Sequence, residues 1–235
     1  MRFHTIVLEG RGPNTMSVAM LDDLLGRLEA AGDDPVLLTG AGGAFSSGLD
    51  LDALSRADAS EIEALLDTME RAVRRLFLHP APVVAAVNGH AVAGGCLVVQ
   101  CCDVRVAVDD PQVRFGMTGV ALGLVYPPFV PAVFRARVPA PHAETVLLGA
   151  RRVDPREALS LGLVDELVPR DHLSARAQEV LLARASLPRP AYAAIKRALR
   201  EPAYAGMDDA HARFRGEGLS TWTQAVFGSR PTPVL

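Results

Sequence analysis

Two glycine-rich segments mark the places where this chain could bind a reacting group. The first, residues 40–50, directly follows an apolar run at 36–39. The second, residues 88–96, directly follows an apolar run at 83–87. Glycine lets a ligand approach the main chain closely, and a helix that begins at Gly94 would point free N–H groups and a partial positive charge into its turn. We therefore expect these two turns to form an anion or oxyanion site.

The elements that must position these turns follow from the spacing of apolar residues. Short apolar runs predict strands at 5–8, 36–39, 83–87, 104–108 and 113–115 and an extended segment at 163–168, and helical spacing predicts helices at 18–30 and 60–78. This alternation is typical of parallel strands with helices packed outside them. Helical patterns then dominate, near 142–148, 155–161, 171–186, 190–199 and 207–226. We expect an α/β core at 1–138 and a helical C-terminal region at 139–235 that serves oligomerisation and covers the pocket.

Composition excludes several classes of protein. A chain of 235 residues can bury a sizeable core, and a net charge of -3 argues against binding to nucleic acid. The three cysteines, at 96, 101 and 102, have no zinc-site spacing, so we expect buried inert thiols, no metal and a cytoplasmic location. Prolines and glycines interrupt the uncharged stretch 80–102, so we expect no membrane span. Phe45 replaces the third glycine of a dinucleotide fingerprint, and no P-loop is present.

The turns carry a family resemblance. Residues 43–51, Gly-Ala-Phe-Ser-Ser-Gly-Leu-Asp-Leu, resemble the first turn of the crotonase superfamily, the enoyl-CoA hydratase/isomerase family. Residues 84–96 resemble its second turn, and 102–107, 115–116, 147–151 and 158–165 resemble its later strands and helices. The resemblance implies an α/β fold, a crotonase-like ββα spiral with a helical C-terminal region, assembled as a homotrimer or a dimer of trimers. It implies an acyl-CoA thioester as ligand, with coenzyme A entering as part of the substrate and no separate cofactor.

The same resemblance assigns roles to individual residues. Backbone N–H groups of Leu49 and Gly94 would hold the thioester carbonyl, where an enolate oxygen develops charge. The residues expected around the substrate are Ser46, Gly48, Asp50, Leu97, Gly119 and His90. Arg11 and Lys196 are the candidates for the coenzyme A phosphates. Asp50 would equally suit the N-terminal cap of the next helix, and His90 a hydrogen bond within its turn.

The chain departs from the family pattern at the positions that transfer protons. A hydratase of the family has one glutamate three residues after the oxyanion glycine and another after the Phe-Gly strand. Leu97 and Gly119 stand at these positions here, and neither can move a proton. Asp52 stands where the family has a basic residue that meets coenzyme A phosphate. We therefore do not expect ordinary enoyl-CoA hydration.

Three interpretations of function remain. The first is an enolate-forming enzyme of fatty acid metabolism, more isomerase-like than hydratase-like, because one displaced base suffices for isomerisation. The second is a lyase of the methylmalonyl-CoA decarboxylase type, because residues 115–126 resemble that enzyme and Tyr126 would supply the acid. That enzyme has a histidine where this chain has Leu49, and Tyr126 could instead be a packed core ring. The third is a non-catalytic partner protein that binds acyl-CoA. A serine hydrolase built on Ser46 or Ser47 is disfavoured because the nucleophile elbow is missing.

Overall fold

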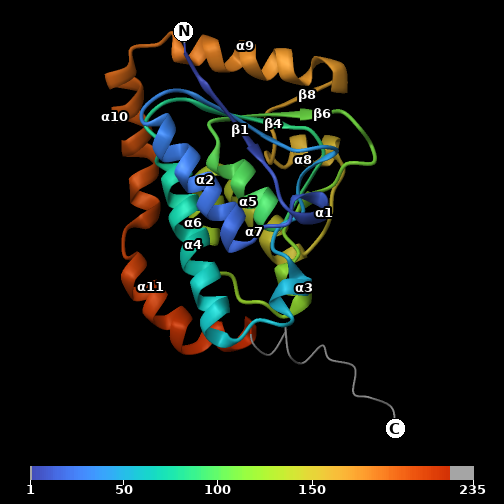
Figure 1. The fold of residues 1–235 in the computed structure, drawn as a ribbon, viewed down its shortest axis with the longest axis vertical. Coiled ribbons are helices and arrows are strands. Elements are labelled where there is room, and N and C mark those ends of the chain that lie inside the picture. Colours follow the sequence, from blue (N-terminus) through green and yellow to red (C-terminus); the bar gives the residue numbers. More distant parts are fainter. Residues whose placement is uncertain (1, 223–235) are drawn as a thin grey trace.

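The structure is a computed structural model that describes residues 2–222 (Figure 1). Its first half contains β1 (His4–Leu8), α1 (Arg11–Asn14), α2 (Val18–Ala31), β2 (Val36–Gly40), β3 (Ala44–Ser46), α3 (Leu51–Leu54), α4 (Ala59–Phe77), β4 (Val83–Val87), β5 (His90–Val92), α5 (Gly94–Cys101), β6 (Val104–Val108) and β7 (Phe115–Gly116). Its second half contains the 3-10 turn η1 (Gly119–Leu122), α6 (Phe129–Arg137), α7 (Ala140–Gly149), α8 (Pro155–Ser160), β8 (Glu166–Val168), η2 (Arg170–His172), α9 (Leu173–Ala185), α10 (Arg189–Arg200), η3 (Glu201–Tyr204), α11 (Met207–Arg213) and the π-helical turn η4 (Phe214–Gly218).

Two parallel sheets are built from repeated strand–strand–helix units. The larger sheet has five strands in the order β1-β2-β4-β6-β8, and the smaller has three in the order β3-β5-β7. Strands β2, β4 and β6 of the larger sheet each lead through a turn into β3, β5 and β7 of the smaller one. Both glycine-rich segments are therefore the corners where the chain passes from one sheet to the other.

Helices on the outside of the larger sheet supply the rest of the core. In Figure 1, α2 and α4 lie side by side, and the two helices contact each other along their apolar faces. Helix α4 begins at a capping box, in which Asp58 and Glu61 each accept the other's backbone N–H. Helix α9 packs against β4 and β6, and α5 is buried at every position.

The predicted α/β architecture is confirmed, with differences where elements are short. Strands β3 and β5 lie inside the glycine-rich segments and were not predicted, because three residues are too few for a periodic pattern. Strand β7 begins at Phe115, whereas 113–115 was predicted. Strand β8, from the region after residue 139, pairs with β6 and completes the larger sheet. The end of the helix predicted at 207–226 lies outside the described residues.

No helix within residues 2–222 combines the length and the apolar character needed to cross a bilayer.

A buried histidine joins the end of α4 to the segment before β2. His79 Nε2 lies 2.9 Å from Asp34 O, and His79 Nδ1 lies 3.0 Å from Arg75 Nη1. Because a guanidinium can only donate, Nδ1 must accept and the ring proton must sit on Nε2, which describes a neutral imidazole. Burial lowers the pKa of His79 to about 4, although the hydrogen bond to the Asp34 carbonyl acts in the opposite direction and raises it.

We expect His79 to make the fold sensitive to acid. Between pH 4 and 6.5 the unfolded chain binds a proton at His79 that the folded protein does not, so stability falls as pH falls through this window. The pKa difference corresponds to at most about 3 kcal/mol. His79→Gln should flatten the dependence of the unfolding free energy on pH, measured by urea unfolding at pH 7 and pH 4.5. Parallel losses in the variant and the wild type would contradict this assignment.

Candidate active site

The two glycine-rich turns approach each other so closely that one glycine is obligatory. Gly48 has a φ of +85°, and a Cβ at this position would lie 2.8 Å from Gly94 N and 2.8 Å from Ala93 Cβ. Any side chain at Gly48 would therefore be strained and would cover the start of α5. The close approach brings the first turn against the N-terminus of the helix that follows the second.

Two asparagines and a serine hold the first turn in place. Asn14 Nδ2 donates to Ala41 O at 2.9 Å and to Ala44 O at 2.8 Å. Asn88 Nδ2 donates to two further carbonyls of this turn, each at 2.9 Å. The buried Ser46 hydroxyl donates to Asn14 O at 2.8 Å and accepts from the N–H of residue 48 at 3.2 Å. The turn is thus fixed by Asn14 at the end of α1, by Asn88 directly after β4, and by its own Ser46.

In each turn, one residue that lines the pocket described below has a backbone N–H with no acceptor within residues 2–222. Met16 pairs with Leu49 in an isolated parallel β-bridge. Its two hydrogen bonds run from Met16 N to Gly48 O and from Asp50 N to Met16 O, so the N–H of Leu49 takes no part in them. Gly94 is the first residue of α5, where a helix has no internal acceptor for its N–H. Leu49 and Gly94 both line the same pocket. The prediction that both N–H groups hold one oxygen is thus compatible with a single pocket and stays a prediction.

This pocket has a volume of about 420 Å³ and a mostly apolar wall. Leu49, Gly94, Leu97, Gly119 and Tyr126, predicted from the sequence, are brought together there. The other lining residues are Ser47, Leu51, Leu66, Met69, Val92, Ala93, Met117, Thr118, Ala121, Leu122, Leu124, Pro127, Val130, Ala150, Arg152 and Trp222. Among these described residues, Tyr126 and Arg152 are the ones with titratable side chains, and neither a carboxylate nor an imidazole is included.

Tyr126 occupies the space that a side chain at position 119 would fill. A Cβ built on Gly119 would lie 2.6 Å from Tyr126 Cε1 and 3.2 Å from the Tyr126 hydroxyl. That hydroxyl accepts a hydrogen bond from Gly119 N at 2.9 Å. Burial raises the pKa of Tyr126, while the Gly119 N–H opposes this shift. The phenol is therefore protonated at neutral pH, and within residues 2–222 its own proton has no acceptor.

Four residues expected around the substrate do not line the pocket: Gly48, which lies against Gly94, and Ser46, Asp50 and His90, which have other contacts. Ser46 is fully buried and braces its turn. Asp50 caps α3 by accepting from Ala53 N at 3.0 Å, as its alternative interpretation predicted, and this bond lowers its pKa. His90 is exposed, and its Nδ1 accepts from Arg114 N at 3.0 Å. Their role as substrate contacts stays a prediction.

The two candidates for the coenzyme A phosphates differ in availability. The Lys196 side chain is 7% exposed, and its ammonium group lies 2.8 Å from Asp103 Oδ2 and 2.9 Å from Ala81 O. Burial lowers the pKa of Lys196 to about 8, although Asp103 opposes this. Lys196 is therefore an internal ion-pair partner, which corrects its assignment to phosphate. Arg11 is 66% exposed beside the first turn, where it pairs with Asp52 at 3.0 Å.

The cysteines are buried, as expected. Burial raises the pKa of Cys96 and Cys102 to about 12 and also raises that of Cys101. Such thiols are protonated and unreactive at neutral pH. Within residues 2–222, no group of three or more His, Cys, Asp or Glu side chains is placed to hold a metal ion.

Sequence reasoning missed Arg152 and Trp222. Arg152 follows the end of α7, and Trp222 lies beyond η4, so both reach the pocket from the C-terminal region. Arg152 is one of 23 arginines, so residue type could not single it out. Trp222 is the only tryptophan of the chain, and this rarity was the one feature of the sequence that could have marked it as a site residue.

Comparison with known proteins places this site in a family. A family model described as "Enoyl-CoA hydratase/isomerase" matches residues 4–216. The chain belongs to the enoyl-CoA hydratase/isomerase family. It is 30% identical over 189 residues to mitochondrial enoyl-CoA delta isomerase 1 of Mus musculus, covering 77% of this chain and 65% of that protein. It is 39% identical over 163 residues to a putative enoyl-CoA hydratase of Thermus thermophilus, covering 66% of this chain and 63% of that protein. The match thus spans less than two thirds of each relative.

Solved structures of the family share the fold. A probable enoyl-CoA hydratase of Mycobacterium tuberculosis has a TM-score of 0.82 and 28% identity, covering 90% of this chain and 92% of that chain. The human mitochondrial delta3-delta2-enoyl-CoA isomerase has a TM-score of 0.80 and 25% identity, covering 94% of this chain and 86% of that chain. The expectation of a crotonase-like fold is confirmed by these likenesses.

The close approach of the turns can be tested with a matched pair of substitutions. Gly48→Ala should weaken binding of butyryl-CoA by about tenfold, roughly the free energy of one hydrogen bond, because the new Cβ would sit 2.8 Å from Gly94 N. Gly42→Ala is the control, since Gly42 lies in the same turn at φ +63° but has nothing within 4 Å of a built Cβ. Isothermal titration calorimetry gives both affinities, with circular dichroism to verify folding. Equal affinities for the two variants would refute the proposed donor geometry.

Proposed function

We propose that this protein is an acyl-CoA thioester enzyme that forms an enolate and protonates it. The thioester oxygen accepts hydrogen bonds from the N–H groups of Leu49 and Gly94, and Tyr126 supplies the proton. The observation that carries this proposal is the shared pocket, which is lined by Leu49, by Gly94 and by Tyr126 with its protonated hydroxyl. Removing one such donor typically costs about 2.7–4 kcal/mol of transition-state stabilisation.

The reaction best matched to these groups is decarboxylation of an α-carboxylated acyl thioester. The Cα–carboxylate bond breaks, carbon dioxide leaves, and the bonding electron pair moves into the enolate held by the two N–H groups. Tyr126 then donates its proton to Cα, and the phenolate regains a proton from water. Decarboxylation needs an acid but no base, and the described lining residues include neither a carboxylate nor an imidazole that could act as one.

Arg152 would recognise the carboxylate of such a substrate. Its neighbour Arg151 pairs with Glu157 at 2.9 Å, whereas no ion pair joins Arg152 to another residue of the described chain. A guanidinium presents a planar fork of donors that matches a carboxylate. An unpaired cation on an otherwise uncharged wall therefore supports an anionic substituent on the acyl group.

Double-bond isomerisation is the second candidate. It is supported by the 30% identity to enoyl-CoA delta isomerase 1 of Mus musculus and by the fold of the human isomerase. Isomerisation requires a base to remove a proton from the acyl chain. Tyr126 could do so only as a phenolate, and its raised pKa disfavours that form at neutral pH.

A single experiment separates these reactions. Malonyl-CoA, methylmalonyl-CoA and a panel of enoyl-CoA thioesters are incubated with the protein in heavy water and analysed by mass spectrometry. Decarboxylation yields a product that has lost carbon dioxide and carries a solvent deuterium on Cα. Deuterium at the α or γ carbon of a thioester that has not lost carbon dioxide would favour isomerisation. Binding without either change, detected by native mass spectrometry, would favour a non-catalytic partner protein.

Tyr126→Phe should lower turnover by about 10²-fold or more, because a positioned acid contributes on that scale. The wild-type rate should stay level through neutral pH and fall only above pH 10, since burial raises the pKa of Tyr126 above its ordinary value and the acid must be protonated. Steady-state rates from pH 6 to 11 test both statements. An unchanged rate in the variant would contradict a role for Tyr126 as the acid and would favour a role in packing alone.

The role of Arg152 can be tested against its neighbour. Arg152→Met should weaken binding of malonyl-CoA by about tenfold or more, because charge-assisted hydrogen bonds contribute about 1.5–3 kcal/mol, while acetyl-CoA should bind as before. Arg151→Met removes an identical charge that is paired outside the pocket, so it should leave both affinities unchanged. Calorimetric affinities for the two thioesters give the comparison. An equal loss for both would assign Arg152 to the coenzyme A phosphates instead.

A further inference from the structure

The C-terminal strap, defined here as residues 207–222, joins α4 to the segment that carries Tyr126. It comprises α11, η4 and the turn that ends at Trp222. In Figure 1, α11 descends beside the lower part of α4. Trp222 is 4% exposed and lines the pocket together with Tyr126. The strap is therefore part of the active-site wall as well as a surface element.

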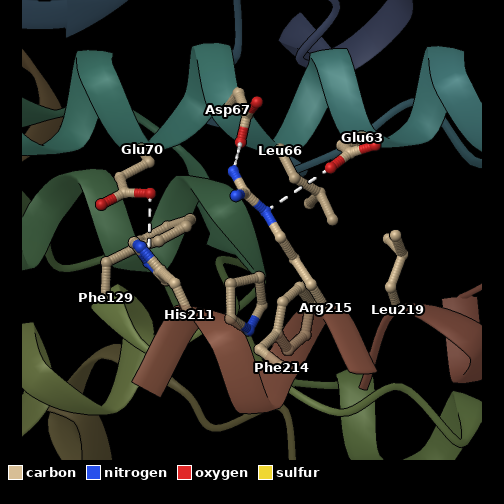
Figure 2. A pocket seen from close by; sticks show the side chains of 10 residues that line it. Glu63, Leu66, Asp67, Glu70, Phe129, His211, Phe214, Arg215 and Leu219 are labelled. Atoms are coloured by element: carbon tan, nitrogen blue, oxygen red, sulfur yellow. Dashed lines mark ion pairs between the residues drawn. The ribbon is translucent and has the colours of Figure 1, made fainter. Parts of the chain in front are cut away.

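The strap contacts α4 through a histidine and an arginine that lie next to acidic side chains of that helix. Figure 2 shows His211 and Arg215 pointing from the strap toward three acidic side chains of α4. His211 Nε2 lies 3.1 Å from Glu70 Oε2, and Arg215 lies 3.5 Å from Glu63 and 3.6 Å from Asp67. The Arg215 pairs are more than half exposed on the arginine side, so solvent screens them and they are weak. These contacts hold the strap near α4 without fixing Tyr126.

At its other end, the strap holds both backbone polar groups of one residue. Trp222 Nε1 donates to Val125 O at 2.8 Å, and Val125 N donates to Thr221 Oγ1 at 3.1 Å. Val125 immediately precedes Tyr126. Adjacent strap residues thus fix the peptide groups on both sides of Val125, and this sets the direction in which the chain enters Tyr126.

Apart from these two bonds, the segment 119–126 is held by turn hydrogen bonds and by Leu124 and Tyr126, which pack against the core. Three of its large apolar side chains are exposed, with Val120 at 41%, Leu122 at 46% and Val125 at 48%. Within the segment, Tyr126 is tied back to Gly119 by the hydrogen bond to its hydroxyl. Segments with few buried contacts open readily, so outside contacts determine their position. The two bonds from the strap are such contacts.

We propose that Thr221 and Trp222 are positioning residues for Tyr126, acting through the backbone of Val125. When the strap is docked, the phenol lines the same pocket as Leu49 and Gly94, and the indole completes the pocket wall. When the strap is released, the segment 119–126 is free to move and the acid loses its alignment. This inference rests on the proposed role of Tyr126 as proton donor.

The first test measures the segment directly and does not depend on activity. Thr221→Val removes the acceptor for Val125 N, and Trp222→Phe removes the indole N–H while keeping an aromatic ring in the wall. Hydrogen–deuterium exchange of a peptide covering 119–126 should become at least severalfold faster in both variants. Thr145→Val is the matched control, because its hydroxyl bonds within its own helix at Pro141. Unchanged exchange in Thr221→Val and Trp222→Phe would overturn the inference.

The second test asks whether the two residues act through the acid. Thr221→Val should lower kcat by about tenfold or more with KM within about threefold, because a small misplacement of a catalytic group is costly. In a Tyr126→Phe background the same substitution should cause no further loss. An equal loss in both backgrounds would show a general structural role and overturn the inference. If Tyr126→Phe alone retains full activity while exchange still rises, the failure belongs to the proposed function of Tyr126, and positioning of an acid is overturned with it.

Discussion

Helix α5 is buried along its whole length, so both of its ends must find partners inside the protein. At its C-terminus, Arg137 and Arg200 donate to the carbonyls of residues 100–102 at 2.9–3.2 Å, and their positive charge opposes the helix dipole. Asp103, next to these carbonyls, pairs with Arg200 at 2.7 Å and with Lys196 at 2.8 Å. At its N-terminus, no residue of the described chain takes the N–H of Gly94. Protein groups thus satisfy the C-terminal end of the helix, whereas its N-terminal end lies at the wall of the pocket.

This division places charge at one end of α5 and apolar surface at the other. The cations and the carboxylate pair around the C-terminus, while Leu97 and the wall around Gly94 are apolar. Backbone N–H donors act more strongly on a developing negative charge when the surroundings exclude water. Because Leu97 and Gly119 stand where the family pattern has proton-transfer glutamates, the proposed enolate needs another source of protons. The ring of Tyr126 lies where a side chain at position 119 would lie, which is why we propose Tyr126 as that source.

The sequence indicated those parts of the site that local backbone geometry determines. Gly48 and Gly94 stand out because a strand, a glycine-rich turn and a helix follow one another directly in the chain. The orientation of a single side chain is not local, which is why Lys196 was assigned to a phosphate although it points inward to Asp103. Arg152 and Trp222 reach the pocket from the C-terminal region, so their contribution depends on tertiary packing that no local pattern encodes. Strands β3 and β5 were missed for a different reason, since three residues carry no periodicity.

The residues proposed as oxyanion donors and the residue proposed as the acid differ in the contacts that hold them in place. The turn that carries Leu49 is held by two asparagines, and Gly94 begins a fully buried helix, so both proposed donors belong to well-packed parts of the core. Tyr126 packs against the core with its ring, but the segment before it is partly exposed and is held by the bond to Gly119 and by the strap. Under the proposed function, enolate stabilisation would therefore depend on the core, whereas proton delivery would depend on peripheral contacts. Such an arrangement would allow the proton-transfer residues to change, and with them the reaction, while the fold remains the same.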